Sequence, residues 1–194
     1  MIGFISYLVN GISLGSVYAL IALGYTMVYG IAKMLNFAHG DVIMIGAYVA
    51  FTAVSGMGMP PVVGVLLSVV ACTVLGVLIE RIAYKPLRKA SKLAVLITAI
   101  GVSYFLQNVA LLIYGANTKS FTSVVTIPAL KLMDDKLVIS GETIVTVVAC
   151  LIIMAGLMTF MKYSKSGRAM LAVSEDSGAA QLMGVNVNAT IALT

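Results

Sequence analysis

The densest polar cluster of the sequence lies between two apolar stretches, in the motif NFAHGD at residues 36–41. Its histidine, amide and carboxylate (His39, Asn36 and Asp41) could in principle bind a metal ion, relay a proton or line a polar path. The single histidine has no evident partner for metal binding, proton relay or catalysis, and the sequence contains no phosphate-binding motif G-x-x-x-x-G-K. Two interpretations stay open. One is a turn around Gly40 with Asp41 as the N-cap of the next helix, and the other is a gate or path lined by His39 and its neighbours.

The composition indicates what kind of chain must position this cluster. Of the 194 residues, 61% are hydrophobic and only 10% are charged, against about 25% charged in soluble domains. The apolar runs are continuous, so they predict helices that satisfy their own backbone in lipid rather than alternating barrel strands. We therefore expect an all-α polytopic transmembrane helix bundle in a single membrane-spanning domain, residues 1–194. About five spans are predicted, at residues 4–31, 42–58, 61–79, 93–114 and 143–161.

The basic residues predict the orientation of these spans. Residues 80–92 and the segment after residue 161 are rich in lysine and arginine, whereas basic and acidic residues balance in 115–142. By the positive-inside rule the first two segments are cytoplasmic and the third is external, which places the N-terminus outside. We ascribe the net charge of +5 to these loops and not to binding of nucleic acid. Cys72 and Cys150 lie inside apolar runs and are interpreted as small core residues.

The second span is short for a membrane of about 30 Å, because its apolar run covers little more than residues 42–54. Either the helix extends through the uncharged SGMGM, or residues 32–41 form a non-helical stretch at membrane depth. Such a stretch is tolerated only where protein or a water-filled cavity covers it, and Gly-interrupted segments often border a transport path.

Several spans also carry small or polar residues. Small residues at four-residue spacing in the first span predict close packing of another helix: Gly11, Gly15 and Ala19. Asn10, with Ser6 and Ser13, either lines a polar path or hydrogen-bonds a partner helix. Gln107 and Asn108 lie in the otherwise apolar fourth span, and each must find a partner, because burying an unpaired amide costs roughly 2–7 kcal/mol.

Residues 162–190 are too polar to cross a membrane and are expected to form a cytoplasmic loop. Within it, Asp176 is a predicted N-cap, residues 179–183 a short helix and Gly184 its left-handed stop. Leu182 and Met183 would offer apolar contact. Because an isolated helix this short is unstable in water, a partner or the rest of the chain must hold it.

Four segments of the chain carry a resemblance to a known family. Within the last of them, GAAQLMG resembles the EAA-loop signature of ABC importer permeases, Glu-Ala-Ala-x-x-x-Gly: Ala179, Ala180 and Gly184 match, and Gly178 stands in place of the glutamate. The four segments closely resemble the LivH family, the permease subunits of branched-chain amino acid ABC transporters. They are NGISLGSVYALIALGYTMVYGIAKMLNFAHGD, IERIAYKPLR, ITAIGVSYFLQN and GRAMLAVSEDSGAAQLMGVNVN. The resemblance covers essentially the whole chain.

The resemblance implies a transport subunit without an ATPase site, cofactor or metal of its own, in the bacterial inner membrane. Its helix at about residues 177–184 would dock on a cytoplasmic ATPase through residues in and beside it: Glu175, Asp176, Ala179, Ala180, Leu182 and Gly184. The implied partners are a second permease subunit, two ATP-binding subunits, an external binding protein that delivers leucine, isoleucine or valine, and membrane lipid. The candidate residues of the translocation path are Asn10, Asn36, His39, Gln107 and Asn108.

Alternatives remain open at this point. A urea or short-amide permease resembles the same family, and no residue here determines the substrate. A self-sufficient channel or ion-coupled transporter would show internal repeats and intramembrane charges, and neither is evident in the spans. Members of the family continue with further spans, whereas this sequence stops at IALT, so we expect a truncated chain.

Overall fold

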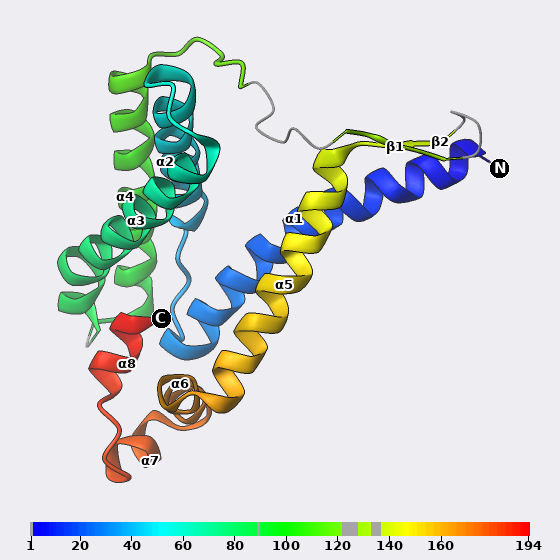
Figure 1. The fold of residues 1–194 in the computed structure, drawn as a ribbon. Coiled ribbons are helices and arrows are strands. Elements are labelled where there is room, and N and C mark those ends of the chain that lie inside the picture. Colours follow the sequence, from blue (N-terminus) through cyan, green and yellow to red (C-terminus); the bar gives the residue numbers. More distant parts are fainter. Residues whose placement is uncertain (1, 89, 122–127, 133–136) are drawn as a thin grey trace. The chain divides into compact units, whose positions relative to one another are not determined.

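The computed structural model describes residues 2–88, 90–121, 128–132 and 137–194 (Figure 1). The chain forms two compact units. The first unit comprises residues 1–31 and 123–190, and the second comprises residues 32–122 and 191–194. Each unit is described by itself below.

The first unit is built on two long helices, α1 (Ile2–Ala32) and α5 (Gly141–Tyr163). They cross where the thiol of Cys150 donates to the carbonyl oxygen of Ser16, with 3.5 Å between sulfur and oxygen. A short antiparallel hairpin, β1 (Leu130–Leu132) paired with β2 (Leu137–Ile139), precedes α5. Two shorter helices follow α5, namely α6 (Lys165–Glu175) and α7 (Ser177–Leu182), and α8 (Val187–Leu193) then runs across the boundary between the units.

The second unit contains three helical segments in sequence. The first is α2 (His39–Phe51), which continues as a π-helical turn, η1 (Thr52–Gly56). The second is α3 (Pro61–Ile79), followed by the π-helical turn η2 (Glu80–Tyr84) and the 3₁₀ turn η3 (Lys85–Leu87). The third is α4 (Lys92–Tyr114), which the Ser91 side chain caps by accepting a hydrogen bond from the backbone N–H of Ala94.

Four helices in the described part of the chain are long and apolar enough to cross a membrane: Gly3–Ala32, Pro61–Leu87, Leu93–Tyr114 and Gly141–Tyr163. The predicted all-α polytopic membrane architecture is therefore confirmed, with the β1–β2 hairpin as a minor addition. The continuous helix of α2 and η1 is shorter. At 1.5 Å per residue, its run from His39 to Gly56 spans roughly 27 Å.

The two alternatives for the second span are each met in part. The helix extends into SGMGM but ends at its second residue, because η1 continues α2 only to Gly56. Residues 33–38 are not helical, and Lys33, directly after α1, has a φ of 54°, in the left-handed region. The depth of this non-helical segment in a membrane stays a prediction.

Helices α2 and α3 pack closely because glycine faces small polar side chains between them. The Ser68 hydroxyl donates to the carbonyl oxygen of Gly46 at 2.7 Å, and the Cys72 thiol donates to that of Val42 at 3.4 Å. A Cβ added at Gly46 would lie 2.6 Å from the Cys72 sulfur and 3.0 Å from the Ser68 hydroxyl oxygen. Cys72 therefore acts as a small packing residue, as the sequence predicts.

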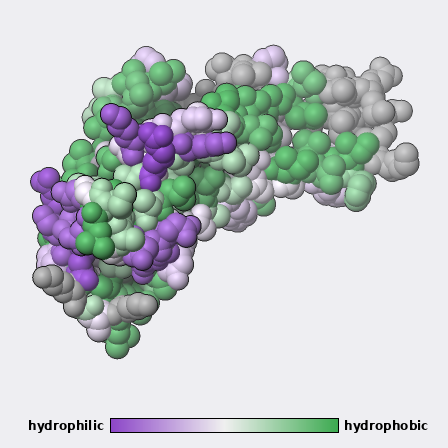
Figure 2. Space-filling model, turned by 90° about the horizontal axis from the view of Figure 1, so that it is seen from below, coloured by the Kyte–Doolittle hydropathy of each residue, from purple (hydrophilic) through white to green (hydrophobic). Residues whose placement is uncertain are grey.

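The surface of the spanning helices is strongly apolar. Large hydrophobic side chains of α1, α3, α4 and α5 are exposed along their lengths, as a lipid-facing surface requires. Figure 2 views the molecule from the end at which α6 and α7 lie in Figure 1. It shows hydrophilic residues gathered at that end, whereas α1 and α5 beyond it carry mainly hydrophobic ones.

Candidate functional site

The polar residues of the NFAHGD motif fasten the start of α2 to the two other helical segments of the second unit. The Asn36 side-chain oxygen accepts two hydrogen bonds, from the backbone N–H of Ala38 at 3.1 Å and from the hydroxyl of Tyr84 at 2.7 Å. The first bond closes a turn that begins at Asn36, whereas Gly40, around which the turn was predicted, lies inside α2. The second connects this turn to η2, 48 residues further along the chain.

Asp41 has a different role from the one predicted. Helix α2 begins at His39, before Asp41, and its N-cap residue Ala38 makes no side-chain capping bond. The prediction that Asp41 caps α2 is therefore wrong. Its carboxylate instead accepts a hydrogen bond from the side-chain amide of Gln107 in α4, at 3.0 Å, and its side chain is buried, with 8% exposure.

Gln107 also bonds within its own helix, since its amide nitrogen lies 3.2 Å from the Ser103 hydroxyl oxygen. We call Asn36, Asp41, Tyr84, Ser103 and Gln107 the α2 polar network. Because each amide or carboxylate in it has a partner, the network avoids the cost of unpaired polar groups in an apolar surrounding. The partner that the sequence analysis required for Gln107 is thus Asp41.

An apolar core lies beside the α2 polar network. It consists of Ala38, Ile79 and Leu106, with 0%, 9% and 5% exposure. These residues come from the start of α2, the end of α3 and the middle of α4, so they join the same three segments as the polar bonds. The π-helical turn η2 follows Ile79 directly and ends at Tyr84. A π turn changes the angular position of the residues that follow it, and here it accompanies the contact of Tyr84 with Asn36.

The remaining candidate path residues make local bonds or lie in the other unit. His39 is half-buried as the first residue of α2, and its backbone N–H donates to the carbonyl oxygen of Asn36 at 3.2 Å. Asn108 is exposed, and its amide donates to the carbonyl oxygen of Tyr104, one turn earlier in α4, at 2.7 Å. Asn10 is exposed on α1, in the other unit.

The small-residue stripe of the first span is open on the structure's surface. Gly11, Gly15 and Ala19 are all exposed, and within the described residues no atom lies within 4 Å of a Cβ added at either glycine. Close packing of another helix against this stripe thus remains a prediction, and a second chain could provide that helix.

The polar end of the first unit forms around an abrupt change of direction after α5. The backbone N–H of Ser164 donates to the carbonyl oxygen of Phe160 at 3.0 Å, and the Ser164 hydroxyl accepts from the N–H of Gly167 at 2.8 Å. Ser164 therefore ends α5 and caps α6. A Cβ added at Gly167 would overlap the carbonyl oxygen of Phe160 and lie 2.5 Å from the Cα of Met161, so only glycine permits this close approach.

Helix α7 is fixed at both ends by local bonds, as predicted. The Asp176 carboxylate accepts from the backbone N–H groups of Gly178 at 2.8 Å and Ala179 at 3.0 Å. At the other end Gly184 has a φ of 85°. The N–H of Gly184 donates to Gln181 and that of Val185 to Ala180, each at 3.0 Å, which is the Schellman arrangement.

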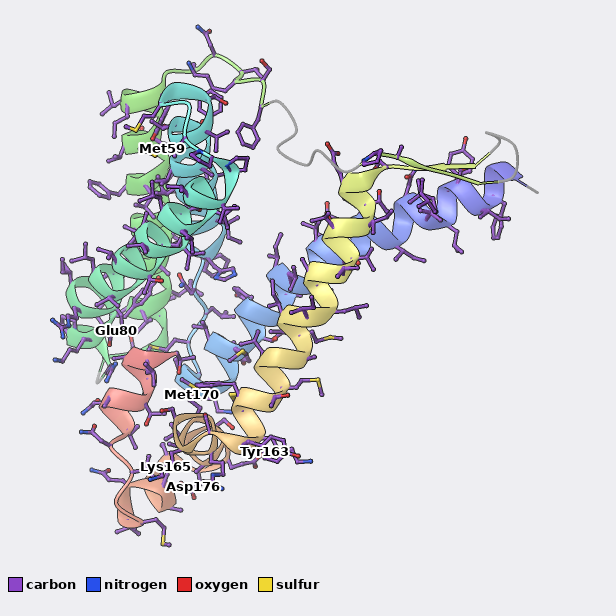
Figure 3. All side chains as sticks on the ribbon, viewed as in Figure 1. Met59, Glu80, Tyr163, Lys165, Met170 and Asp176 are labelled. Carbon is purple, nitrogen blue, oxygen red and sulfur yellow. The ribbon has the colours of Figure 1, made fainter. Side chains whose placement is uncertain are left out.

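The side chains of α7 divide into a held face and a displayed face. Ala180 is buried at 4% exposure, whereas Leu182 and Met183 are 90% and 85% exposed. Glu175, Asp176 and Ala179 are also exposed, and Asp176 lies at the junction of α6 and α7 (Figure 3). Two large apolar side chains are thus displayed at the surface beside two exposed acidic residues.

Sequence reasoning missed Tyr84 and Ser103 as members of the α2 polar network. Tyr84 comes at the end of the charged stretch after the third span, where a tyrosine also suits a membrane interface, so nothing local pointed to Asn36. Across the described ranges, no group of three or more His, Cys, Asp or Glu side chains is arranged to hold a metal ion.

The apolar helices and the helical end segment define a multi-pass α-helical membrane protein. Residues 7–194 match the family described as the branched-chain amino acid transport system permease component. The chain belongs to this family, and the resemblance inferred from its motifs is confirmed.

Named relatives agree with this assignment. The chain is 42% identical to the high-affinity branched-chain amino acid transport system permease protein BraD of Pseudomonas aeruginosa, over 98% of this chain and 66% of that protein. It is 39% identical to the corresponding protein LivH of Escherichia coli, over 98% of this chain and 65% of LivH. A probable branched-chain amino acid transport permease protein LivH of Methanocaldococcus jannaschii is 29% identical, over 88% and 55%. The chain thus spans about two thirds of the length of the first two relatives. No solved structure matches it.

Proposed function

We propose that this chain is a transmembrane subunit of an ATP-driven ABC importer for branched-chain amino acids. Family membership supports the transport class, and the names of the relatives support the substrate class of leucine, isoleucine and valine. The energy source would be a separate ATPase, because the sequence has no G-x-x-x-x-G-K motif. A second permease subunit, two ATP-binding subunits and an external binding protein complete the proposed assembly, in the bacterial inner membrane with the N-terminus outside.

The observation that carries the proposal is the geometry of α7. A free helix of 6 residues would not be stable in water, yet α7 is fixed by the Asp176 cap and the Gly184 stop. It displays Leu182 and Met183 within about twenty residues of the end of α5, a membrane-length helix. We propose that α7, with Leu182 and Met183, docks in a groove of the ATPase. It would then transmit the ATP-driven movement of the ATPase to the spans.

The test is a cross-link between α7 and the ATPase. Leu182→Cys, in a chain with Cys72→Ser and Cys150→Ser, would be expressed with the ATP-binding subunits of the same transporter and treated with a short bifunctional thiol reagent. We expect a cross-linked product with the ATPase, and a much weaker one from Ile152→Cys, which is exposed in the middle of α5. Equal cross-linking at both positions, or none at position 182 together with unchanged uptake by a bulky Gly184 variant, would contradict docking through α7.

The path for the amino acid is proposed to pass beside the start of α2. Asn36, His39, Gln107 and Asn108 place polar side chains on the helical segments of the second unit, and Asn10 of α1 is proposed separately as a path residue. The expected observation is that Asn36→Cys, in the same cysteine-free background, reacts with a water-soluble thiol reagent in at least one transport state. Absence of labelling in every state would leave Asn36 with a packing role alone.

A further inference from the structure

We propose that the junction between α5 and α6 binds the phosphate headgroups of anionic phospholipids. The binding surface, called here the basic elbow, consists of Lys162, Tyr163, Lys165 and Arg168. This inference goes beyond the proposed transport function and does not depend on it, since it requires only that α5 crosses the membrane.

The C-terminal end of α5 lies at the depth of the lipid headgroups. Helix α5 is membrane-length over Gly141–Tyr163, so its last residues come to the layer where hydrocarbon meets the headgroups. Tyr163 is 68% exposed at this end, the position at which tyrosine rings commonly lie in the interface. The ammonium nitrogen of Lys162 lies 5.5 Å from the centre of the Tyr163 ring, which keeps a cation beside the ring.

The basic elbow also holds further cations close to the same layer. Ser164 is the single residue between α5 and α6, so α6 starts as soon as the chain leaves the membrane. Its hydroxyl bond to Gly167 and the backbone contact of Gly167 with Phe160 and Met161 determine the direction of α6. Tyr163 and Lys165 flank Ser164 at this junction (Figure 3).

The charged side chains of α6 are unevenly distributed around the helix. Its buried residues are Gly167, Met170 and Val173. At about 100° per residue, Lys165 and Arg168 lie on the face opposite these three, and both are exposed. The first acidic residue of α6 is Glu175, which follows Lys165 by about 15 Å along the helix. The first two turns therefore present basic side chains without an acidic neighbour on their own helix.

These features suit a lipid phosphate. A lysine ammonium offers a point charge and an arginine guanidinium can bind phosphate oxygens in pairs, while the Tyr163 ring can contact the glycerol and upper acyl region. Each basic side chain near an anionic membrane surface raises the affinity for that surface about fivefold. The three cations together would thus distinguish phosphatidylglycerol from the zwitterionic phosphatidylcholine.

The test uses native mass spectrometry of the purified full chain with phosphatidylglycerol or phosphatidylcholine added. The test variant is Lys162→Gln/Lys165→Gln/Arg168→Gln. The matched control, Arg81→Gln/Lys85→Gln/Lys119→Gln, removes three exposed cations elsewhere and gives the same change of net charge. A third variant, Lys162→Arg/Lys165→Arg/Arg168→Lys, keeps all three charges and so separates loss of charge from any loss of fold.

We expect the test variant to bind phosphatidylglycerol at least tenfold more weakly than the unmodified chain, with phosphatidylcholine binding unchanged in every variant. The charge-retaining variant should stay within about twofold of the unmodified chain, and the matched control should lose clearly less affinity than the test variant. Equal losses in the test variant and the matched control would overturn the site, as would no loss in the test variant or a loss in the charge-retaining variant. Inorganic phosphate at equal concentration should not displace the lipid, and displacement would overturn the assignment to a membrane lipid.

Discussion

The side-chain amide of Gln107 donates a hydrogen bond to the carboxylate of Asp41, at 3.0 Å, across two helices and 66 residues of sequence. Asp41 is buried, with 8% of its surface exposed. A buried carboxylate without a partner would be costly, so this bond and the neighbouring bond between Tyr84 and Asn36 hold the start of α2 in one position. The second unit is thereby specified by polar contacts as well as by apolar packing.

The first prediction concerns the coupling of these two residues. Asp41→Ala and Gln107→Ala should each lower the free energy of unfolding by about 1–3 kcal/mol, because a hydrogen bond to a charged group is lost. The double variant should lose less than the sum, with a coupling energy of about 0.5–3 kcal/mol, measured by denaturation in detergent. Asn108→Ala is the control: its amide bonds to Tyr104 of its own helix and it is exposed, so a change within about 0.5 kcal/mol is expected. Strict additivity of the Asp41 and Gln107 variants would show that the bond does not contribute.

The second prediction concerns the contact of α2 with α3. Gly46→Ala should destabilise the chain by about 1–3 kcal/mol, because the new methyl group would lie 2.6 Å from the Cys72 sulfur. Removing that sulfur with Cys72→Ala should restore part of the loss, although the bond to Val42 goes with it.

The measurement is the thermal midpoint of the single and double variants in detergent. Gly76→Ala on α3 is the control, since among the atoms of the described residues nothing lies within 4 Å of its added Cβ. If adding Cys72→Ala lowers the thermal midpoint of the Gly46→Ala variant further, α2 and α3 are not in the close contact seen here.

The third prediction concerns the turn from α5 into α6. Gly167→Ala should open this turn, because the added methyl group meets backbone atoms of Phe160 and Met161 that cannot move aside as a side chain could. We expect faster trypsin cleavage after Lys165 and Arg168, by tenfold or more, together with weaker lipid binding by the basic elbow. Gly156→Ala, in open space on α5 as far as the structure describes it, should leave cleavage unchanged. Identical cleavage of both variants would indicate that Gly167 does not determine the turn.

The fourth prediction separates capping from charge at Asp176. Asp176→Ala removes the acceptor for Gly178 and Ala179 and should destabilise α7 by about 0.5–2 kcal/mol, with weaker binding of the ATPase. Asp176→Ser retains a capping oxygen without the charge. If capping is what matters, the serine variant should bind nearly as well as the unmodified chain in a pull-down of the ATP-binding subunits. A serine variant as weak as the alanine variant would instead indicate a direct charge contact with the partner.

Features that residues close in sequence determine could be predicted without the structure. The cap at Asp176 and the stop at Gly184 follow from residues within a few positions of each other, and both are confirmed. The membrane class also follows from composition, because no other solvent tolerates so much exposed apolar surface. The family followed from motifs distributed along the chain, and the match over residues 7–194 confirms it.

Asp41 shows why the remainder could not be predicted. An acidic residue next to glycine before an apolar run looks like an N-cap, but α2 begins two residues earlier and the partner of Asp41 is on α4. Pairings such as Asp41 with Gln107 and Asn36 with Tyr84 depend on how three helices pack and on the π-helical turn η2. Tertiary packing of this kind leaves little trace in the local sequence pattern.

The most direct test of the account is the uptake of labelled leucine by vesicles containing this chain with the other subunits of its transporter. Uptake should require ATP, compete with isoleucine and valine but not urea, and fall by at least tenfold in Leu182→Asp/Met183→Asp, while this variant remains in the membrane. Uptake that continues without ATP, or that the double variant leaves unchanged, would contradict an importer driven through α7.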